Sequence, residues 1–391
     1  MNLDHADVAI CVSDDGPREP GGAASTSTPI VQTSLFSYPT YAELSDALAA
    51  EHANRVYSRG QNPTVEALEL KLARLERGEM CKCFASGMAA VNAVMFGVLR
   101  QGDHVLFVNQ VYGPALQLAR EYERFGVTHD AIPDTDPSAI AAAIRPNTRL
   151  IWLESPGTML MKLLDIRAVV ALARERGILT CMDNSWATPL LQKPIELGVD
   201  LVVHSATKYL AGHSDLMGGV LVGARERMLD IFRRAYMLNG GILAPFEAWL
   251  MLRGMRTLPV RLRQHEADAR RVAEFLQSHP RVSRVHYPAT DPDQQALLTR
   301  QMRGSTGLLS FELTGADFTG VSRVIDALQY FRIGVSWGGV ESIVISAERR
   351  TGTEHLEAQR LPRGLIRLSI GLEGADVLIV DLEQALSAGR A

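Results

Sequence analysis

Short apolar runs alternate with amphipathic stretches along most of the chain after residue 60. Runs of strand length, rich in Val, Leu and Ile, lie at residues 104–108, 149–153, 178–182 and 201–203. Apolar residues recur at three- and four-residue spacings, which is typical of helices, at residues 64–77, 115–124 and 166–176. A regular alternation of strands with helices predicts an α/β fold with a mostly parallel sheet and crossover helices.

The pattern changes near residue 245, where we expect a second domain to begin. A long helical pattern covers residues 259–279, and later runs at 308–313 and 365–370 have strand character. A chain of 391 residues also exceeds what one hydrophobic core usually serves. We predict a large domain over residues 61–248 and a C-terminal domain over residues 249–391. Residues 1–60 would form an N-terminal arm, whose first 26 residues lack sustained periodicity.

Composition and charge narrow the possible partners and the compartment. The net charge is −4, and six arginines between residues 253 and 271 recur at helical spacing, which indicates a solvated helix face rather than a nucleic-acid site. No run approaches the roughly 20 apolar residues of a membrane span, and the N-terminus does not have the basic and then apolar pattern of a signal peptide. The four cysteines lack zinc-ligand spacing, so we expect free thiols and no metal. These observations predict a cytoplasmic protein without nucleic-acid or membrane partners.

The candidate chemistry begins at the end of the 201–203 run. Lys208 follows this run, and the hydroxyl residues Ser205 and Thr207 precede the lysine. In an open α/β sheet, ligands bind beyond the carboxyl ends of the strands. Two hydroxyl donors suit a phosphate, and a nearby amine suits an aldehyde with which it can bond covalently. Pyridoxal phosphate carries both groups, whereas Lys208 taken alone would be read as a solvated turn residue.

Two neighbouring signals support this cofactor. Asp183 ends the 178–182 run, where its carboxylate would keep a pyridine nitrogen protonated so that the ring can accept electrons. Ser86 and Gly87 stand at a strand-to-helix turn, and bare backbone N–H groups at a helix N-terminus bind anions such as phosphate. Read separately, the aspartate is a common turn or cap residue and the Ser-Gly pair a common helix cap.

Aromatic and basic residues on other segments are weaker candidates. Tyr112 lies on a turn where its ring could stack on a flat cofactor or simply pack. Tyr57 and Arg59 share one face of an extended segment, and a guanidinium matches phosphate oxygens well. Arg367, on the 365–370 strand, is either a surface charge or a clamp for a carboxylate.

These motifs together resemble the family of pyridoxal phosphate enzymes of cysteine and methionine metabolism, which share the fold of aspartate aminotransferases (fold type I). The markers are residues 205–215 (SATKYLAGHSD), 57–59 (YSR), 86–88 (SGM), 183–184 (DN) and 336–342 (SWGGVES). The resemblance extends from about residue 34 to the C-terminus. It implies a large domain with a mostly parallel seven-stranded sheet and a smaller C-terminal α/β domain.

The resemblance also implies roles for individual residues. Lys208 would hold the cofactor, Asp183 would face its pyridine nitrogen, and Tyr112 would stack on its ring. The phosphate would be bound by Ser86, Gly87, Met88, Ser205 and Thr207. Tyr57 and Arg59 would join this site from the arm of a neighbouring subunit, in a dimer or a dimer of dimers. Arg367 with Ser336 would grip the carboxylate of an amino-acid substrate, and Tyr57, Tyr112 and Trp337 would line the same pocket.

Within the family, the chain most resembles bacterial cystathionine β-lyases, through Trp337 and through residues 154–157 (ESPG) and 252–258 (LRGMRTL). This implies α,β-elimination from cystathionine-type amino acids, giving a thiol, pyruvate and ammonia. Lys208 would remove the Cα proton, and Tyr112 would handle a second proton because a neighbouring cation favours an ionised phenol. Residues 57–63 and 240–246 instead resemble γ-acting members, so γ-elimination or γ-replacement on a cystathionine-, methionine- or O-linked homoserine-type amino acid is the alternative. A regulator that binds the cofactor without turnover is a remote third reading.

Overall fold

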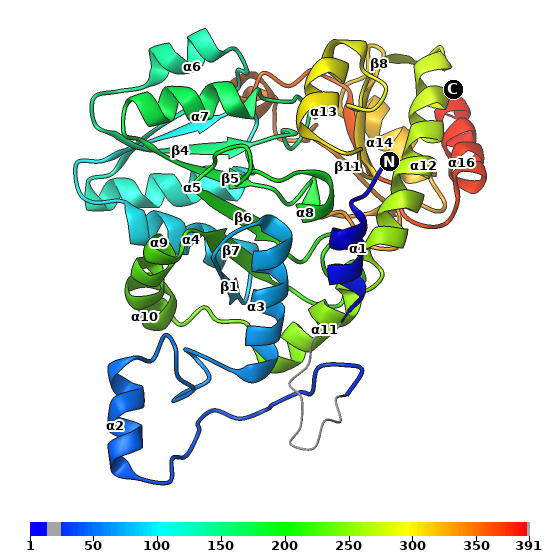
Figure 1. Cartoon of the computed structure of the whole chain (residues 1–391). Coiled ribbons are helices and arrows are strands. Elements are labelled where there is room, and N and C mark those ends of the chain that lie inside the picture. The colour runs from blue at the N-terminus through cyan, green and yellow to red at the C-terminus, as the bar shows by residue number, and fades with distance from the viewer. Residues whose placement is uncertain (14–24, 389–391) are drawn as a thin grey trace.

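Two β-sheets organise the chain, a large one and a smaller one (Figure 1). The computed structural model describes residues 1–13 and 25–388. The large sheet has the strand order β1-β7-β6-β5-β4-β2-β3. Its strands are β1 (Met80–Phe84), β2 (His104–Val108), β3 (Thr128–Ile132), β4 (Thr148–Glu154), β5 (Leu179–Asp183), β6 (Leu201–Ser205) and β7 (Gly219–Gly223). Neighbours from β3 to β6 run parallel, and only β7 runs antiparallel to its neighbours β6 and β1, which confirms the predicted mostly parallel sheet.

Helices cover both faces of the large sheet. One face carries α4 (Gly87–Val98), α5 (Gly113–Tyr122) and α9 (Arg225–Ile231), and the other carries α3 (Pro63–Glu76), α6 (Pro137–Ala143) and α7 (Ile166–Glu175). Phe107 and Trp152 are buried on the first face, while their chain neighbours Leu106 and Ile151 are buried on the second. Because both faces are covered, the strands read as continuous apolar runs in the sequence.

Short segments connect the larger elements of this half of the chain. They are η1 (Glu123–Phe125), α8 (Thr188–Leu191), η2 (Phe232–Tyr236), α10 (Met237–Asn239) and α11 (Pro245–Met255). The boundary that we predict between residues 248 and 249 falls inside α11, so the chain passes from one half to the other along a helix.

The second sheet has the strand order β10-β11-β12-β9-β8 and confirms the predicted second α/β unit. Its strands are β8 (Val282–His286), β9 (Leu308–Leu313), β10 (Arg332–Ile333), β11 (Ile343–Ser346) and β12 (Leu365–Ser369). The associated helices are α12 (Leu258–Ser278), η3 (Pro292–Gln294), α13 (Gln295–Gln301), α14 (Phe318–Ala327), α15 (Glu354–Ala358) and α16 (Ala375–Ala388). Side chains of α12, α14 and α16 share one apolar core with this sheet.

The N-terminal segment differs from the prediction. Residues 5–12 form helix α1 (His5–Val12), where the sequence predicted an irregular leader. Asp7 is fully buried, and its carboxylate forms ion pairs of 2.8 Å with both Arg77 and Lys193. An eight-residue helix is too short to be stable alone, so these tertiary contacts stabilise it rather than any long periodic pattern. Residues 14–24 of the predicted leader lie outside the described residues.

The segment that contains helix α2 (Tyr41–Ala49) extends away from the body of the molecule, and we refer to it as the arm (Figure 1). Its apolar side chains have little to pack against in one chain, because Tyr41 is 83% exposed and Leu48 is 50% exposed.

The sequence predicted that the arginine-rich segment forms a solvated helix face, but one of its arginines is buried. Arg261 is buried, and its guanidinium donates to Thr257 Oγ1 at 3.0 Å and to the carbonyl of Gly254 at 2.8 Å. The four cysteines are free and buried. Within residues 1–13 and 25–388, no helix combines the length and apolar character needed to cross a bilayer.

Candidate active site

The candidate residues lie at the carboxyl ends of two neighbouring strands, β5 and β6. Asp183 is the last residue of β5 and pairs with Val203 in the parallel register with β6. Ser205 is the last residue of β6, and Lys208 follows in a turn, where its backbone N–H donates to the carbonyl of Ser205 at 3.2 Å. The sheet therefore brings the aspartate and the lysine to one edge, where open α/β sheets bind ligands.

The amine of Lys208 points toward the loop that precedes β11. Its Nζ donates to Ser336 Oγ at 2.5 Å and lies 5.5 Å from the centre of the Trp337 ring. Burial, and after it the charge of Arg367, lower the pKa of Lys208 to about 8, while Asp183 opposes the shift. Such an amine is partly unprotonated near neutral pH, which is the form that attacks an aldehyde or accepts a proton.

The loop that carries Ser336 and Trp337 lies directly on the lysine turn. A Cβ added to Gly338 would lie 2.9 Å from the backbone nitrogen of Tyr209, and the φ of Gly338 is +84°. Glycine is therefore required at this close approach. Ser336 itself has a φ of +81°, which is unusual for a residue with a side chain, and this conformation accompanies its bond to Lys208. The Trp337 ring packs on Tyr209 at 5.5 Å between ring centres.

Asp183 is half-buried, with few hydrogen-bond donors around it. Its Oδ1 accepts from the backbone N–H of Ser185 at 2.9 Å. Burial raises the pKa of Asp183, while Ser185, His204 and Lys208 oppose the shift. A carboxyl in such a site gains most from a cationic partner, and the protonated nitrogen of a pyridine ring is one.

The start of α4 lies against the end of β6. Ser86 caps this helix, because its Oγ accepts from the backbone N–H of Ala89 at 3.1 Å. A Cβ added to Gly87 would lie 3.0 Å from the Cβ of Ser205, so only glycine leaves the helix N-terminus open beside that hydroxyl residue. Met88 follows in the first turn, and its side chain packs into the core, which leaves its backbone N–H as the group that can face an anion.

Thr207 completes this side of the site. Its Oγ1 accepts from the backbone N–H of Gly218 at 3.0 Å. Backbone N–H groups at a helix start together with hydroxyl groups form a site for a phosphate. The donor set, with a half-buried lysine and a half-buried aspartate beside it, therefore fits pyridoxal phosphate.

Tyr112 is the residue before α5, and its side chain is 46% exposed. Its backbone N–H donates to Glu154 Oε2 at 2.7 Å, which fixes the loop. Burial raises the pKa of Tyr112, and the carboxyl groups of Asp183 and Glu154 raise it further, while Arg367 opposes the shift. The chain alone thus favours the neutral phenol, and the predicted ionised form requires a cation bound at the site.

Arg367 faces inward from β12. It is therefore not a solvated surface charge, which was one of the two predictions from the sequence. Its Nη1 donates to the carbonyl of Thr158 at 3.1 Å and lies 3.8 Å from Met159 Sδ. Burial lowers the pKa of Arg367 to about 10, while Glu154 and Tyr112 oppose the shift. No carboxylate among the described residues lies within ion-pair distance of this guanidinium, so it can bind the carboxylate of an incoming molecule.

Tyr57 and Arg59 do not join this group within one chain. Both are exposed, and the Arg59 guanidinium lies 5.5 Å from the centre of the Tyr57 ring. They lie after α2 in the chain, and Figure 1 shows α2 away from the body. In the part of the chain that the structure describes, no hydrogen bond, ion pair or ring contact connects them to the other candidate residues.

Several supporting residues were not predicted as site residues. Ser185 Oγ accepts from the backbone N–H of Ser205 at 2.6 Å and so ties the ends of β5 and β6 together. Behind the same strand ends, Glu76 Oε1 accepts from Asn184 Nδ2 at 2.8 Å and lies 2.6 Å from His204 Nε2. Proximity to Asp183 in the sequence could have suggested Ser185, whereas Glu76 is 108 residues from Asn184 and carries no such signal.

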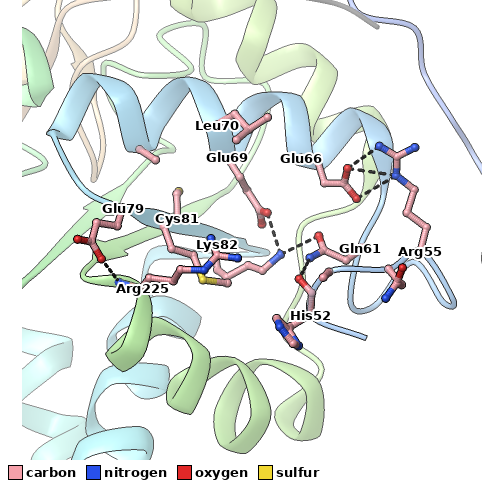
Figure 2. A pocket seen from close by; sticks show the side chains of 14 residues that line it. His52, Arg55, Gln61, Glu66, Glu69, Leu70, Glu79, Cys81, Lys82 and Arg225 are labelled. Carbon is pink, nitrogen blue, oxygen red and sulfur yellow. Dashed lines mark hydrogen bonds and ion pairs between the residues drawn. The ribbon is translucent and has the colours of Figure 1, made fainter. Parts of the chain in front are cut away.

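A separate cavity of about 450 Å³ lies between the arm, α3 and β1 (Figure 2). Figure 2 shows two ion pairs in it, Lys82 with Glu69 at 2.8 Å and Arg55 with Glu66 at 2.7 Å, and Glu79 accepting from the backbone N–H of Arg225. None of the candidate residues above lines this cavity. The three basic side chains and three glutamates that line it have no net formal charge, so it gives no indication of a charged ligand.

Comparisons with known proteins show the family of the chain. The family described as Cys/Met metabolism PLP-dependent enzyme matches residues 11–387. The L-methionine gamma-lyase of Pseudomonas putida is 40% identical over 380 residues, which cover 95% of this chain and 94% of that protein. The cystathionine beta-lyase of Bacillus subtilis (strain 168) is 39% identical over 372 residues, with 94% and 93% covered.

A solved structure has the same fold. It is the cystathionine gamma synthase of Xanthomonas oryzae pv. oryzae in complex with aminoacrylate and cysteine, which is 35% identical with a TM-score of 0.89 over 98% of each chain. The chain therefore belongs to the family of pyridoxal phosphate-dependent enzymes of cysteine and methionine metabolism.

Proposed function

We propose that the enzyme cleaves the Cβ–S bond of cystathionine-type amino acids by α,β-elimination, releasing a thiol, pyruvate and ammonia. The observation that carries this proposal is the position of Trp337, whose ring centre lies 5.5 Å from the amine of Lys208. A bulky ring at this place limits the room beyond Cα and favours departure of a group from Cβ. The same ring packs on Tyr209, which makes it a rigid wall.

γ-Elimination is the alternative, and it has equal support from the relatives. A methionine gamma-lyase and a cystathionine beta-lyase match the chain at 40% and 39% identity. Thr158 and Met159 stand where many γ-acting relatives carry Asn-Pro, which favours the β reaction. Residues 57–63 and 240–246 favour the γ reaction.

In this reaction, each candidate residue of the chain would have a separate role. Pyridoxal phosphate, when bound, withdraws electrons from the substrate and makes the Cα proton acidic. Arg367 and Ser336 would hold the substrate carboxylate, which orients the Cα–H bond toward Lys208. The Lys208 amine would then take the Cα proton. Asp183 would hold a positive charge on the ring nitrogen, and Tyr112 would cover the ring and handle a second proton at the leaving group.

We also propose that the active enzyme is a homo-oligomer. Helix α2 has nine residues and exposes Tyr41 and Leu48, although an isolated helix of this length is marginal in water. A second copy of the chain would cover this arm and would receive Tyr57 and Arg59 beside its phosphate site. Closed symmetry of this kind is the common arrangement for enzymes.

The test of the reaction is product analysis with cystathionine as substrate. The β reaction gives pyruvate and homocysteine, whereas the γ reaction gives 2-oxobutanoate and cysteine. Mass spectrometry of the oxo acid and of the thiol distinguishes them in one sample. We expect pyruvate with little 2-oxobutanoate. A majority of 2-oxobutanoate, or cleavage only of an O-linked γ-substituted amino acid, would establish the γ alternative.

A further inference from the structure

Glu154 is a buried carboxyl group at the candidate site that the assignments above do not use. It is the last residue of β4, is 8% exposed, and pairs with Asp183 of β5 in the parallel register. Paired residues on neighbouring strands point to the same face of a sheet. The fold therefore places two carboxyl groups side by side at one edge. Among the described residues, no cation forms an ion pair with Glu154.

The structure gives Glu154 one well-defined partner. Its Oε2 accepts from the backbone N–H of Tyr112 at 2.7 Å. Tyr112 is the N-cap residue of α5, and its own side chain forms no capping bond. The carboxyl group of Glu154 therefore fixes the loop at the residue whose ring would cover the cofactor.

The rest of this loop is tied to the segment after β4. Asn109 Nδ2 donates to the carbonyls of Glu154 and Lys162, both at 2.8 Å. The backbone N–H of Thr158 donates to the carbonyl of Gln110 at 2.9 Å, and Thr158 in turn accepts from Arg367. One continuous set of hydrogen bonds thus links the segment that precedes Tyr112 to the guanidinium on β12.

We propose that Glu154 is a positioning residue, which holds Tyr112 through its backbone N–H beside the strand end that carries Asp183. The consequence for catalysis rests on the proposed function, whereas the contact itself does not. Burial raises the pKa of Glu154 well above its usual range, and Asp183 raises it further, while Tyr112, Arg367 and Thr158 oppose the shift. A raised pKa favours the neutral acid, in which Glu154 still accepts the N–H of Tyr112 and adds no second negative charge next to Asp183.

Amide hydrogen exchange on the cofactor-free protein tests the contact without any turnover. Glu154→Ala removes the acceptor, whereas Glu154→Gln keeps an acceptor oxygen and removes the acid. We expect the Tyr112 amide to exchange at least about tenfold faster in the alanine variant and near the wild-type rate in the glutamine variant. Asp200→Ala is the matched control, because Asp200 accepts the backbone N–H of Thr180 at 2.9 Å at the amino end of β5, away from the site. Equal exchange of the Tyr112 amide in all four proteins would overturn the proposal.

A double-mutant cycle tests the consequence. If Glu154 acts through Tyr112, then Glu154→Ala lowers kcat/KM about tenfold or more in the wild-type background but less than about twofold in a Tyr112→Ala background. Glu154→Gln should recover most of the loss. The cycle can be measured with whichever product the enzyme forms, so an error in the reaction subtype does not affect it. An equal loss in both backgrounds, or a glutamine variant as poor as the alanine variant, would show that Glu154 acts by another route.

Discussion

The amine of Lys208 donates a hydrogen bond of 2.5 Å to the hydroxyl of Ser336. The two residues are 128 positions apart, and they belong to the end of β6 and to the loop before β11. The bond therefore joins the cofactor side of the candidate site to its substrate side. Trp337 follows Ser336 directly, so the same loop that contacts the lysine also brings an aromatic wall to it.

This arrangement predicts that Trp337 affects the rate of the reaction more than the affinity for the cofactor. Trp337→Ala should lower the rate of β-cleavage about tenfold or more, a size typical of a lost substrate-positioning contact, because it opens the space beyond Cα. The affinity for pyridoxal phosphate should change by less than about threefold. Phe246→Ala is a control for loss of an aromatic ring, since Phe246 is half exposed on α11. A variant that loses cofactor affinity and activity in parallel would show that the ring only supports the fold.

The pKa of Lys208 predicts how the cofactor-free protein takes up pyridoxal phosphate. With a pKa of about 8, about one amine in ten is unprotonated at pH 7 and about nine in ten at pH 9. The attachment rate, followed by absorbance, should therefore rise with pH and level off above about pH 9. Because Arg367 lowers this pKa and Asp183 raises it, Arg367→Ala should move the midpoint to higher pH and Asp183→Asn to lower pH. A midpoint above pH 10 in the wild-type protein would contradict the burial of the amine.

Asp183 should be needed for chemistry more than for binding. Asp183→Ala should still bind pyridoxal phosphate through the lysine and the phosphate site, but elimination should fall by about 10² to 10³-fold, as for the loss of other groups that stabilise a developing charge. Spectral titration and steady-state rates measure the two properties separately. Near-normal turnover in this variant would show that the carboxylate does not face the ring nitrogen.

The strand ends could be predicted from the sequence, whereas the environments of several side chains could not. The apolar runs that precede Asp183 and Ser205 correspond to β5 and β6, because strands covered on both faces leave continuous apolar patterns. The inward direction of Arg367 depends on its bond to Thr158, which lies 209 residues away. Local patterns carry no record of such a contact.

Two departures from the sequence predictions have the same origin. Helix α1 is stabilised by the buried pairs of Asp7 with residues of other elements rather than by a long periodic pattern. Arg261 is buried because backbone carbonyls and Thr257 satisfy its guanidinium. In both cases tertiary hydrogen bonds or ion pairs bury a charged residue, and local patterns in the sequence do not indicate such contacts.

The exposed position of Tyr57 and Arg59 predicts that active sites are shared between subunits. An Arg59→Ala chain and a Lys208→Ala chain should each be nearly inactive, because each lacks one part of every site. Mixing them under conditions that allow subunit exchange should restore activity, since each mixed dimer has one complete site. Mixing Arg59→Ala with an Asp183→Ala chain should give the same recovery, and mixing Lys208→Ala with Asp183→Ala should give none. Recovery in the last mixture, or in none of the three, would contradict sharing.

Chemical trapping tests whether the active site is built around Lys208. Borohydride reduction of the protein with bound pyridoxal phosphate makes the lysine link permanent, and peptide mass spectrometry then locates the modified residue. We predict one pyridoxyl-phosphate group per chain, on Lys208, and its absence in Lys208→Ala, whose turnover should fall by at least about 10² to 10⁴-fold. The exposed Lys162, replaced by alanine, should leave both the modification and the rate unchanged. Stoichiometric modification of another lysine in the wild-type protein, or retained turnover in Lys208→Ala, would contradict the account.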